Sequence, residues 1–568
     1  MKSEWTRRDF MKAAGLGAGF MIASGYSPFS YAQNEKVHVG CIGTGGQGTF
    51  HLRDGIAGAE ALEVVAIADV FLPHQKGGIM YGQCANGGVK VEAGKHPNDL
   101  PVEEKIKIRD ARRPNGYYNY KEMLEKENLD AVIIATPLTQ HFQPTMDCLD
   151  AGKYVFCEKT LVRSIEDGRA LITKCHDTGK FVQVGHQRRY NPKYLLAMNM
   201  AYEQGLLGRI THLTAQWHRN TYWRRAWQLE YPDYVLNEEE QKYIKDLEKH
   251  LNWRMYQDLS GGLYTELATH QTDIANWFMH GVPARVNAFG GLDYWRDGRD
   301  VDDNIMLSFE YEQKPGDPGF MTLDRRSELQ KLPLLNKPYT VRFAYSSILM
   351  NMKRGSSELI QGDWGSVELT EQDCFFYPEP NPRAEAQARL DAAKKEQEGG
   401  DAAKEGENKP NTIQSGGSLQ VDTKALKDGI GLLVDRDLKT PDVYQFEAFA
   451  HHIKNGGVPR SNQMVGFTTA ITALSAIQSR TEGKVIEIDP EWYAFDFETP
   501  SFYDWAWEDE KYPKMPGAEA PAELNSQPAD GAAPAAPADP AAPAAPAEPA
   551  PAAPAAPAEP APAAPENV

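Results

Sequence analysis

The sequence predicts an α/β protein with a doubly wound parallel sheet in its N-terminal part and a second, mainly antiparallel α/β domain after it. Two observations carry this prediction. Between residues 36 and 185, short apolar strand patterns alternate with helical patterns, which is typical of a parallel sheet covered by helices on both faces. Residues 282–376 instead alternate polar and apolar side chains in short runs, which is typical of half-exposed antiparallel strands.

The first 32 residues have the three parts of an export signal. Residues 6–12 are basic, residues 13–23 are apolar, and Ser30-Tyr31-Ala32 is a small-residue cleavage site. The paired arginines Arg7 and Arg8, followed by Phe-Met-Lys, resemble a twin-arginine (Tat) signal. We therefore expect the Tat export machinery as a partner, cleavage after Ala32 and a periplasmic mature protein.

The first predicted strand, residues 36–42, leads directly into a glycine-rich run, and a helix is predicted from Thr49 to Ile56. The run is Gly43-Thr-Gly45-Gly-Gln47-Gly48. Gly43 permits a tight turn, Gly45 lets the backbone approach a pyrophosphate, and Gly48 lets the helix pack close to the strand. This G-x-G-x-x-G pattern predicts a dinucleotide site, with Gln47 among its contacts.

An acidic residue follows the second predicted strand. This strand, residues 62–68, ends at Asp69, which lies 21 residues beyond Gly48. A carboxylate at this place binds the ribose 2′-hydroxyl and repels a 2′-phosphate. The sequence therefore favours NAD over NADP as the cofactor.

The rest of the parallel sheet follows less evenly. Residues 71–116 are Gly-rich and poorly periodic, and we expect a long connection there that holds at most one strand. Helices are then predicted at 121–128 and 141–150, and strands at 130–136, 154–157 and 181–185. Since ligands bind at the carboxyl ends of such strands, the residues there are predicted cofactor contacts. They are Thr136, Pro137, His141, Glu158, Lys159 and Arg188.

Two of these residues have alternative interpretations. His141 suits a helix cap as well as a cofactor contact. Arg188 suits a cofactor phosphate, a substrate acid or a structural carboxylate equally well.

Five ordered motifs resemble the Gfo/Idh/MocA oxidoreductase family. They are 43–48, 135–141, 151–159, 184–189 and 261–273, and together they cover most of residues 36–375. The resemblance implies an NAD-binding Rossmann domain, residues 33–190, and a C-terminal α/β domain, residues 191–515, on a large open sheet. In the family this sheet often forms an oligomer interface, so we expect a homo-oligomer. Exported members such as glucose-fructose oxidoreductase also carry a Tat signal.

The resemblance also assigns the family's two site motifs, with one departure in each. The Glu-Lys-Pro motif falls on Glu158, Lys159 and Thr160, and the Asp-x-x-x-His motif falls on Glu266 and His270. Thr160 replaces the usual proline, which argues against a cis peptide bond there. Glu266 replaces the usual aspartate and reaches one methylene further.

These residues can carry out a proton-coupled oxidation. Glu266 and His270 are four residues apart and share one face of a helix. His270 can take a hydroxyl proton, Lys159 can stabilise the negative charge that develops on the same oxygen, and Glu266 can orient the imidazole or a second hydroxyl. The alternatives are a core or capping histidine and a surface lysine.

An aromatic and basic segment, residues 217–254, supplies a predicted sugar site. Trp217 and Trp253 can stack on sugar C–H surfaces, while Arg219 and Arg254 can bind hydroxyls. Core or interface aromatics explain the same pattern equally well. Asp273, one turn beyond His270, is a further candidate for substrate binding.

Composition limits the other function classes. The formal net charge of -19 argues against nucleic acid or an anionic membrane as a partner, and no apolar run is long enough for a span in the mature chain. The six cysteines lack metal or disulfide spacing, so we expect small buried residues and no metal. The Ala/Pro-rich tail, residues 516–568, predicts disorder, and the charged insertion at about 379–427 predicts part helix and part disorder. Helices are predicted at 442–454 and 462–480 and should pack back on the core.

The sequence thus predicts an oxidoreductase that moves a hydride between a sugar, glycoside or polyol and tightly bound NAD in the periplasm. One alternative is a redox-assisted glycosidase or lyase that passes through a transient keto-sugar. A second alternative is a non-catalytic, cofactor-bearing binding protein.

Overall fold

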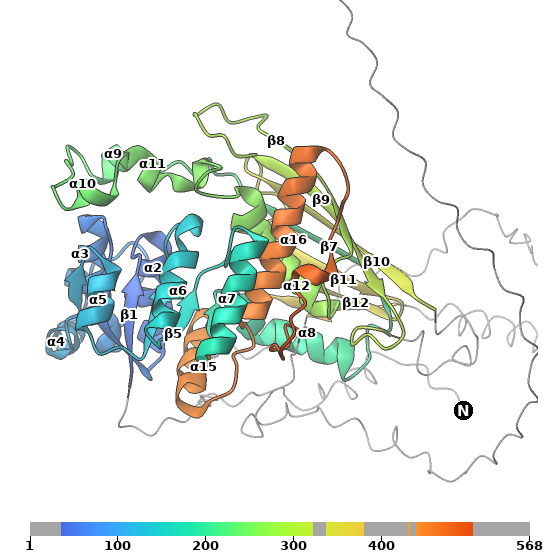
Figure 1. Ribbon diagram of the computed structural model, residues 1–568, viewed down its shortest axis with the longest axis horizontal. Coiled ribbons are helices and arrows are strands. Elements are labelled where there is room, and N and C mark those ends of the chain that lie inside the picture. The colour runs from blue at the N-terminus through green and yellow to red at the C-terminus, as the bar shows by residue number, and fades with distance from the viewer. Residues whose placement is uncertain (1–35, 322–336, 380–429, 432–438, 504–568) are drawn as a thin grey trace, which may run out of the picture. The chain divides into compact units, whose positions relative to one another are not determined.

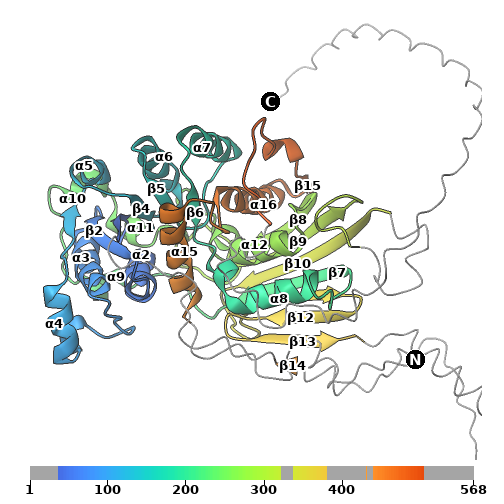
Figure 2. The same cartoon turned by 90° about the horizontal axis from the view of Figure 1, so that it is seen from below.

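The computed structural model describes residues 36–321, 337–379, 430–431 and 439–503, which all belong to one compact unit. The predicted signal, residues 1–32, and the predicted tail, residues 516–568, lie outside these residues. The predicted charged insertion lies outside them too, except for its first residue. Figures 1 and 2 show a parallel sheet with its helices beside a larger open sheet, and the predicted α/β class is confirmed.

The N-terminal sheet has six parallel strands in the order β3-β2-β1-β4-β5-β6. The strands are β1 Val37–Ile42, β2 Leu62–Ala68, β3 Asn115–Tyr117, β4 Ala131–Ile134, β5 Tyr154–Cys157 and β6 Val182–Val184. The helices between them are α2 Gly46–Phe50, α3 Leu72–Asn86, α4 Val102–Asp110, α5 Tyr120–Lys126, α6 Phe142–Asp150 and α7 Ile165–Thr178. The strand order reverses direction beside β1, so the crevice where such sheets bind ligands opens at the carboxyl ends of β1 and β4.

The expected long connection over residues 71–116 is wrong. This segment contains α3 and α4 besides the short strand β3. The glycines that suggested a loop allow close helix packing instead. A Cβ atom at Gly78 would lie 2.6 Å from Thr44 Oγ1, and one at Gly82 would lie 2.9 Å from Pro114. Small residues here let α3 lie directly on the sheet and on the glycine-rich turn.

The second sheet has nine strands in the order β14-β13-β12-β11-β7-β10-β9-β8-β15. Only the β7–β10 pair is parallel, so the predicted mainly antiparallel sheet is confirmed. The strands are β7 Ile210–His218, β8 Arg285–Gly291, β9 Asn304–Gln313, β10 Tyr339–Ile348, β11 Ser356–Gly362, β12 Gly365–Leu369, β13 Cys374–Pro378, β14 Ile430–Gly431 and β15 Ile486–Glu487.

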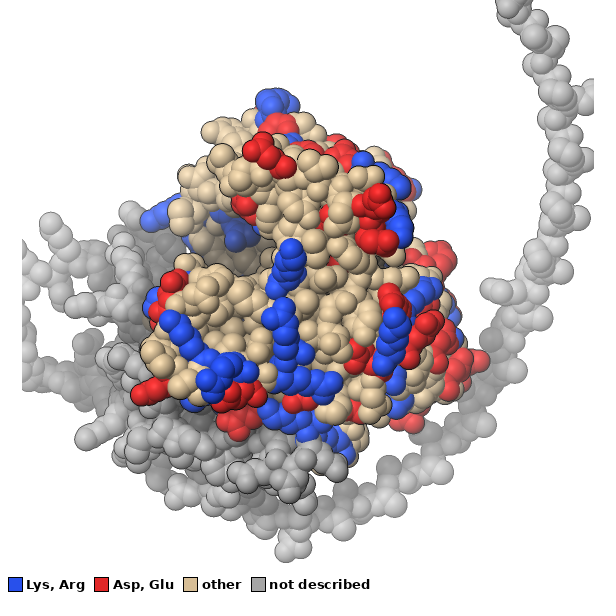
Figure 3. Space-filling view, turned by 90° about the vertical axis from the view of Figure 1, so that its left-hand side faces the viewer, with Lys and Arg blue, Asp and Glu red and all other residues tan. Residues whose placement is uncertain are grey.

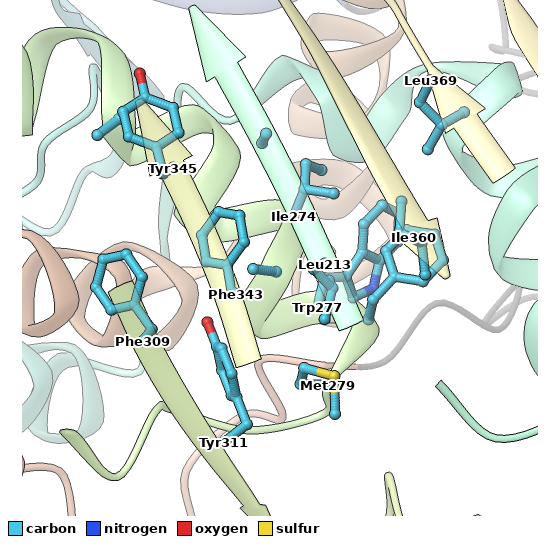
Figure 4. Packing of buried hydrophobic residues seen from close by; sticks show 14 of the residues in the cluster. Leu213, Ile274, Trp277, Met279, Phe309, Tyr311, Phe343, Tyr345, Ile360 and Leu369 are labelled. Carbon is cyan, nitrogen blue, oxygen red and sulfur yellow. The ribbon is translucent and has the colours of Figure 1, made fainter. Parts of the chain in front are cut away.

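Helices cover one face of this second sheet. They are α8 Pro192–Tyr202, α12 Thr269–Phe278 and α16 Gln463–Glu482. In Figure 4, Phe309 and Phe343 from neighbouring strands lie with Trp277 and Ile274 of α12 in one buried cluster. This core fixes the start of α12, which carries the predicted site residues.

The C-terminal helices pack back on both sheets, as predicted. Helix α15, Pro441–Asn455, inserts Phe446 and Phe449 into the Rossmann core beside β1. Helix α16 places Phe467 and Ile471 in another buried apolar cluster of the Rossmann domain, and Ala476 in the core of the nine-stranded sheet. Because α16 contributes to both cores, it holds the two sheets together.

A connection after β7 lies over the Rossmann domain. We call residues 219–256 the strap. It contains the short helices α9 Trp227–Glu230, α10 Glu240–Tyr243 and α11 Leu247–Leu251, which lie along the upper side of the Rossmann domain in Figure 1. The buried ring of Phe71 anchors it in an apolar cluster with Ile244 and Leu251.

Candidate functional site

The glycine-rich turn connects β1 to α2 at the crevice. Gly43 has a φ of +82°, a left-handed conformation that favours glycine, and so makes the tight turn that the sequence predicts. A Cβ atom at Gly48 would lie 2.0 Å from the carbonyl oxygen of Gly43, so only glycine fits where the helix meets the turn. Gly43, Gly45 and Gln47 line a cavity of about 740 Å³, whereas Gly48 is buried behind it.

This first cavity has the size and the polar lining of a dinucleotide site. Its volume falls in the range of roughly 300–1,000 Å³ that small-molecule sites occupy. It extends from Asp69 past the glycine-rich turn to Lys159 and Glu266. The predicted cofactor residues Asp69, Thr136, Pro137, His141, Glu158 and Lys159 all line it.

The Asp69 carboxylate is held at the end of β2 by backbone amides. Thr44 N donates to Oδ2 at 2.7 Å and Phe71 N donates to Oδ1 at 2.9 Å. Burial raises the pKa of Asp69 despite these hydrogen bonds. Oδ2 also accepts from Thr44 Oγ1 at 3.4 Å, whereas Oδ1 keeps a second lone pair that can accept from a ribose hydroxyl.

Two further predicted contacts lie on the loops after β4 and β5. The His141 ring contacts Thr160 O at 2.8 Å through Nδ1 and Thr136 O at 3.0 Å through Nε2, and burial lowers its pKa. The neutral ring carries one N–H, so it donates to one of these carbonyls at a time and lies between the two loops. Glu158 accepts from His51 Nε2 at 2.6 Å; burial favours its neutral form, but His51 and Lys159 outweigh this and lower its pKa.

The peptide bond between Lys159 and Thr160 is cis, so the expectation of a trans bond is wrong. Thr160 takes the place of the family's proline through contacts on both sides of the backbone. Its hydroxyl donates to Thr265 O at 3.0 Å, and its carbonyl contacts His141. The adjoining Lys159 side chain points to the start of the segment that carries Glu266 and His270.

Lys159, Glu266 and His270 come together as the sequence predicts. Lys159 Nζ donates to Glu266 O at 3.0 Å and lies 3.8 Å from Glu266 Oε2. Glu266 lies in a π-helical turn, Tyr264–Ala268, and His270 in the first turn of α12. All three residues line a second cavity of about 420 Å³, and Lys159 and Glu266 line the first cavity as well.

The surroundings lower the pKa of both Glu266 and His270. Burial would favour a neutral Glu266, but Lys159 and Arg254 outweigh this and lower its pKa. Burial, together with Lys159, Arg188, His186 and Arg219, lowers the pKa of His270 well below its ordinary value of 6.5. The imidazole is therefore neutral near pH 7, which is the form that accepts a proton.

Most residues of the predicted sugar site line the second cavity. Trp217, Arg219, Trp253 and Arg254 line it, and the Trp217 ring lies 5.4 Å from the ring of His270. The Arg254 guanidinium lies 4.4 Å from the ring centre of Trp253 and donates to Glu266 Oε2 at 2.9 Å. Aromatic faces and donors are thus presented beside the proposed reacting groups.

Two predicted contacts are absent from both cavities and prove to be structural. Arg188 is buried, pairs with Glu358 and lies 5.2 Å from the ring centre of Trp217, which it supports from behind the cavity. Asp273 is buried in a bidentate pair with Arg189 at 2.8–3.0 Å. A charge this deeply buried needs a charged partner, and each of these residues has one within the protein.

Several lining residues were not predicted. His74, Lys242, Tyr243 and His250 line the first cavity, and His51, Glu371, Asp442 and Gln445 line the second. Most come from the strap, from β-strand ends or from α15, far along the chain from the motifs. No local sequence pattern marks them. The Asp442 carboxyl, whose pKa burial raises to about 6, lines the second cavity although it lies far from the site motifs in the sequence.

The surface is hollowed on the side where the Rossmann domain lies. Figure 3 shows a hollow between the upper and lower parts of this face, with Lys or Arg side chains inside it. Among the described residues, no helix is long and apolar enough to cross a bilayer. The described His, Cys, Asp and Glu side chains form no group suited to a metal ion. The prediction that the six cysteines are buried is confirmed.

Family models match both parts of the chain. Residues 95–186 match the oxidoreductase family with an NAD-binding Rossmann fold, of the Gfo/Idh/MocA type, and residues 195–317 match the Gfo/Idh/MocA C-terminal domain. The chain contains both domains of the Gfo/Idh/MocA oxidoreductase family. Its first cavity, with the glycine-rich turn and Asp69, fits the NAD that this Rossmann domain binds.

Curated relatives of these Gfo/Idh/MocA domains include oxidoreductases and a glycosidase. An uncharacterised oxidoreductase of Streptococcus pneumoniae is 23% identical over 45% of this chain and 59% of its own. An inositol 2-dehydrogenase of Rubrobacter xylanophilus is 28% identical over 33% and 45%. An alpha-N-acetylgalactosaminidase of Shewanella oneidensis is 27% identical over 39% and 50%. The chain spans about half the length of these relatives.

Solved structures share the fold over a longer stretch. The aldose-aldose oxidoreductase from Caulobacter crescentus, complexed with glycerol, has a TM-score of 0.51 at 14% identity and covers 80% of this chain and 100% of its own. Levoglucosan dehydrogenase, in complex with NADH and levoglucosan, has a TM-score of 0.50 at 15% identity over 80% and 100%. At these identities the likeness concerns the fold alone.

Proposed function

We propose that this Gfo/Idh/MocA protein is an NAD(H)-dependent oxidoreductase that acts on a carbinol carbon of a sugar, glycoside or polyol. The observation that carries the proposal is the meeting of the two cavities. Lys159 and Glu266 line both of them, and His270 lines the second. A hydroxyl held beside these three side chains therefore lies next to the cofactor cavity. The relative named as an inositol 2-dehydrogenase supports this class of substrate.

The chain's own residues manage the proton and the charge. NAD, when bound, supplies the acceptor for the hydride. The neutral His270 imidazole takes the hydroxyl proton, and its lowered pKa keeps it ready to do so. The Lys159 ammonium stabilises the negative charge on the same oxygen. Glu266 holds Lys159 and Arg254 in place through its carbonyl and carboxylate oxygens.

The strap supports tight cofactor binding as part of this proposal. Arg225, Lys242 and His250 of the strap line the first cavity. Buried Glu240 accepts from the backbone amide of Leu72 at 2.8 Å, and so fastens the strap to the start of α3. A closed strap would slow cofactor exchange, which suits an enzyme exported with its cofactor already bound.

Export to the periplasm and self-association are two further parts of the proposal. The Arg7-Arg8 signal supports Tat export to the periplasm, and fractionation of cells that produce the full chain tests it. Phe289 and Met306, paired across β8 and β9, are 69% and 66% exposed on the sheet face that the helices leave uncovered. Such apolar exposure favours a homo-oligomer, which light scattering of the purified protein tests.

The main experiment combines cofactor and product analysis. Mass spectrometry of the purified native protein shows whether NAD accompanies it, and NADP in its place would contradict the Asp69 argument. Absorbance of the reduced nicotinamide is then followed with a panel of sugars, glycosides and polyols. A stable keto-sugar together with reduced cofactor supports the proposal. The proposal fails, in favour of a binding protein, if no compound reduces the cofactor and His270→Ala and Lys159→Ala leave the cellular phenotype intact.

A redox-assisted glycosidase is the second candidate. The glycosidase relative of Shewanella oneidensis favours it, and so does Asp442, a half-buried carboxyl in the second cavity. A carboxyl whose pKa lies at about 6 is partly protonated near neutral pH and can donate a proton to a leaving group. Net cleavage of a glycoside without release of NADH would support this candidate over the first.

A further inference from the structure

The cations of the second cavity differ in whether the protein already neutralises them. Lys159 and Arg254 both contact Glu266, at 3.8 Å and 2.9 Å from its Oε2 atom. Arg225 pairs with Glu230, and this partner raises the pKa of Arg225 in spite of burial. All three therefore have a carboxylate partner within the protein, which Lys159 and Arg254 share.

Arg219 is different. It follows β7 directly and its guanidinium lies 5.5 Å from the ring centre of Trp217, the residue beside His270. Within the described part of the chain, this guanidinium makes neither a hydrogen bond nor an ion pair. Burial and repulsion from Arg254 lower its pKa, although Glu371 attracts it from a distance. A half-buried cation thus opens into the cavity without a partner at contact distance.

We propose that Arg219 binds a carboxylate group of the substrate, so that the preferred substrates are sugar acids such as uronic acids. The inference rests on the proposed function and names its substrate class. The planar guanidinium presents two parallel N–H donors, which match the two oxygens of a carboxylate. Its stack on Trp217 fixes the direction of those donors. A sugar held in this way has its ring beside His270 and Lys159.

The other charges of the cavity favour a single negative charge on the substrate. Glu371 and Asp442 line the same cavity, and Glu371 lies 3.4 Å from Arg188. These acids would repel a phosphate dianion more strongly than a carboxylate. A neutral sugar, by contrast, would leave the Arg219 charge desolvated and uncompensated. The cavity therefore favours a substrate carboxylate over both a phosphate dianion and a neutral group.

The test measures binding and selectivity together. Isothermal titration of the NAD-loaded full-length protein compares three pairs: glucuronate with glucose, galacturonate with galactose, and mannuronate with mannose. Glucose-6-phosphate is the phosphate probe. We expect at least one uronate to bind about 10- to 100-fold more tightly than its neutral partner, because a charge-assisted hydrogen bond is worth that much. Arg219→Gln should remove this preference, so that each uronate binds no more tightly than its neutral partner.

A matched variant controls for the loss of one positive charge. Arg296 is exposed and donates to backbone carbonyls outside both cavities, so Arg296→Gln should keep the full preference for uronates. Three results would overturn the inference: uronates and neutral sugars that bind alike, a preference that survives Arg219→Gln, or a phosphate sugar that binds more tightly than every uronate. Turnover of neutral sugars alone would overturn it while the proposed function stands. If no sugar of either class binds, the proposed function itself fails.

Discussion

The two cavities differ in how their polar groups are used. In the cofactor cavity the protein's own backbone already engages two of the predicted contacts: Asp69 accepts from two backbone amides, and the His141 ring lies at hydrogen-bond distance from two carbonyls. In the second cavity the His270 ring and the Arg219 guanidinium keep their polar ends open. The first cavity is thus shaped by contacts within the protein. The second leaves His270 available for the reaction and Arg219 available for substrate selectivity.

This difference has a structural origin. The cofactor cavity is built mainly from loops at the ends of parallel strands, which the sheet fixes in place, and strap residues complete its lining. The second cavity is built from the start of α12, the strap and α15, which meet through tertiary packing. Changes in the first cavity should therefore act on cofactor binding, and changes in the second should act on the reaction.

The largest expected effect concerns the reaction itself. His270→Ala and Lys159→Ala should each lower kcat by about 10²- to 10⁴-fold, because each removes a group that moves a proton or stabilises charge. NAD affinity, measured by titration, should change far less for His270→Ala, which lies outside the first cavity. His176→Ala and Lys121→Ala are surface controls that should keep wild-type kcat. A His270→Ala variant with unchanged kcat would remove His270 from the mechanism.

The second effect concerns the glycine-rich turn. Gly48→Ala would place a Cβ atom 2.0 Å from the Gly43 carbonyl oxygen, so the turn must shift. Overpacking of this kind costs about 1–3 kcal/mol, and we expect NAD affinity to fall by roughly 10- to 100-fold. Gly77→Ala in α3, where no atom lies within 4 Å of the new Cβ and which lines neither cavity, should bind NAD normally. Equal affinities for the two variants would contradict the close packing of α2 on the turn.

The third effect concerns the strap. Glu240 is buried and accepts from Leu72 N, Tyr234 Oη and Asn237 N at 2.7–2.8 Å. Glu240→Ala leaves these donors without an acceptor, at a cost of about 1–3 kcal/mol, and should raise the NAD dissociation rate by roughly 10-fold. Fluorescence of the released cofactor checks this, with exposed Glu238→Ala as the control. A dissociation rate that matches the control would mean that the strap does not retain the cofactor.

The smallest effect concerns the pH dependence of the second cavity. The base must be unprotonated, and burial with nearby cations lowers the pKa of His270 well below 6.5. The acidic limb of kcat/KM should therefore lie below pH 6.5. Arg219→Gln removes one of these cations, so the pKa of His270 should rise and the limb should move to higher pH. A limb that stays in place or moves to lower pH would contradict this electrostatic account.

Much of the fold followed from local patterns, and the failures have physical causes. The strands around the glycine-rich turn and the helices α15 and α16 were predicted because their apolar periodicity is strong. Helix α3 was missed because Gly78 and Gly82, which usually weaken a helix, are needed for close packing here. The cis bond before Thr160 was not expected because proline is absent, and distant contacts hold Thr160 instead.

The site residues, too, could be predicted only where they belong to contiguous sequence motifs. Residues in contiguous motifs, such as Gly43, Asp69 and Lys159, line a cavity as predicted. Arg188 and Asp273 do not, because a charge at a strand or helix end can serve a buried ion pair as readily as a ligand. The strap and Asp442 reach the cavities by long-range packing, which leaves no signal in the local sequence.

The central claim is that a substrate carbinol in the second cavity passes its hydride to NAD in the first. The most direct test incubates the NAD-loaded protein with glucose and glucuronate that carry deuterium on carbon, followed by mass spectrometry of the cofactor. The account predicts one deuterium in the reduced nicotinamide, and none with His270→Ala under the same conditions. Substrate conversion with a cofactor that stays unlabelled and oxidised throughout would contradict it.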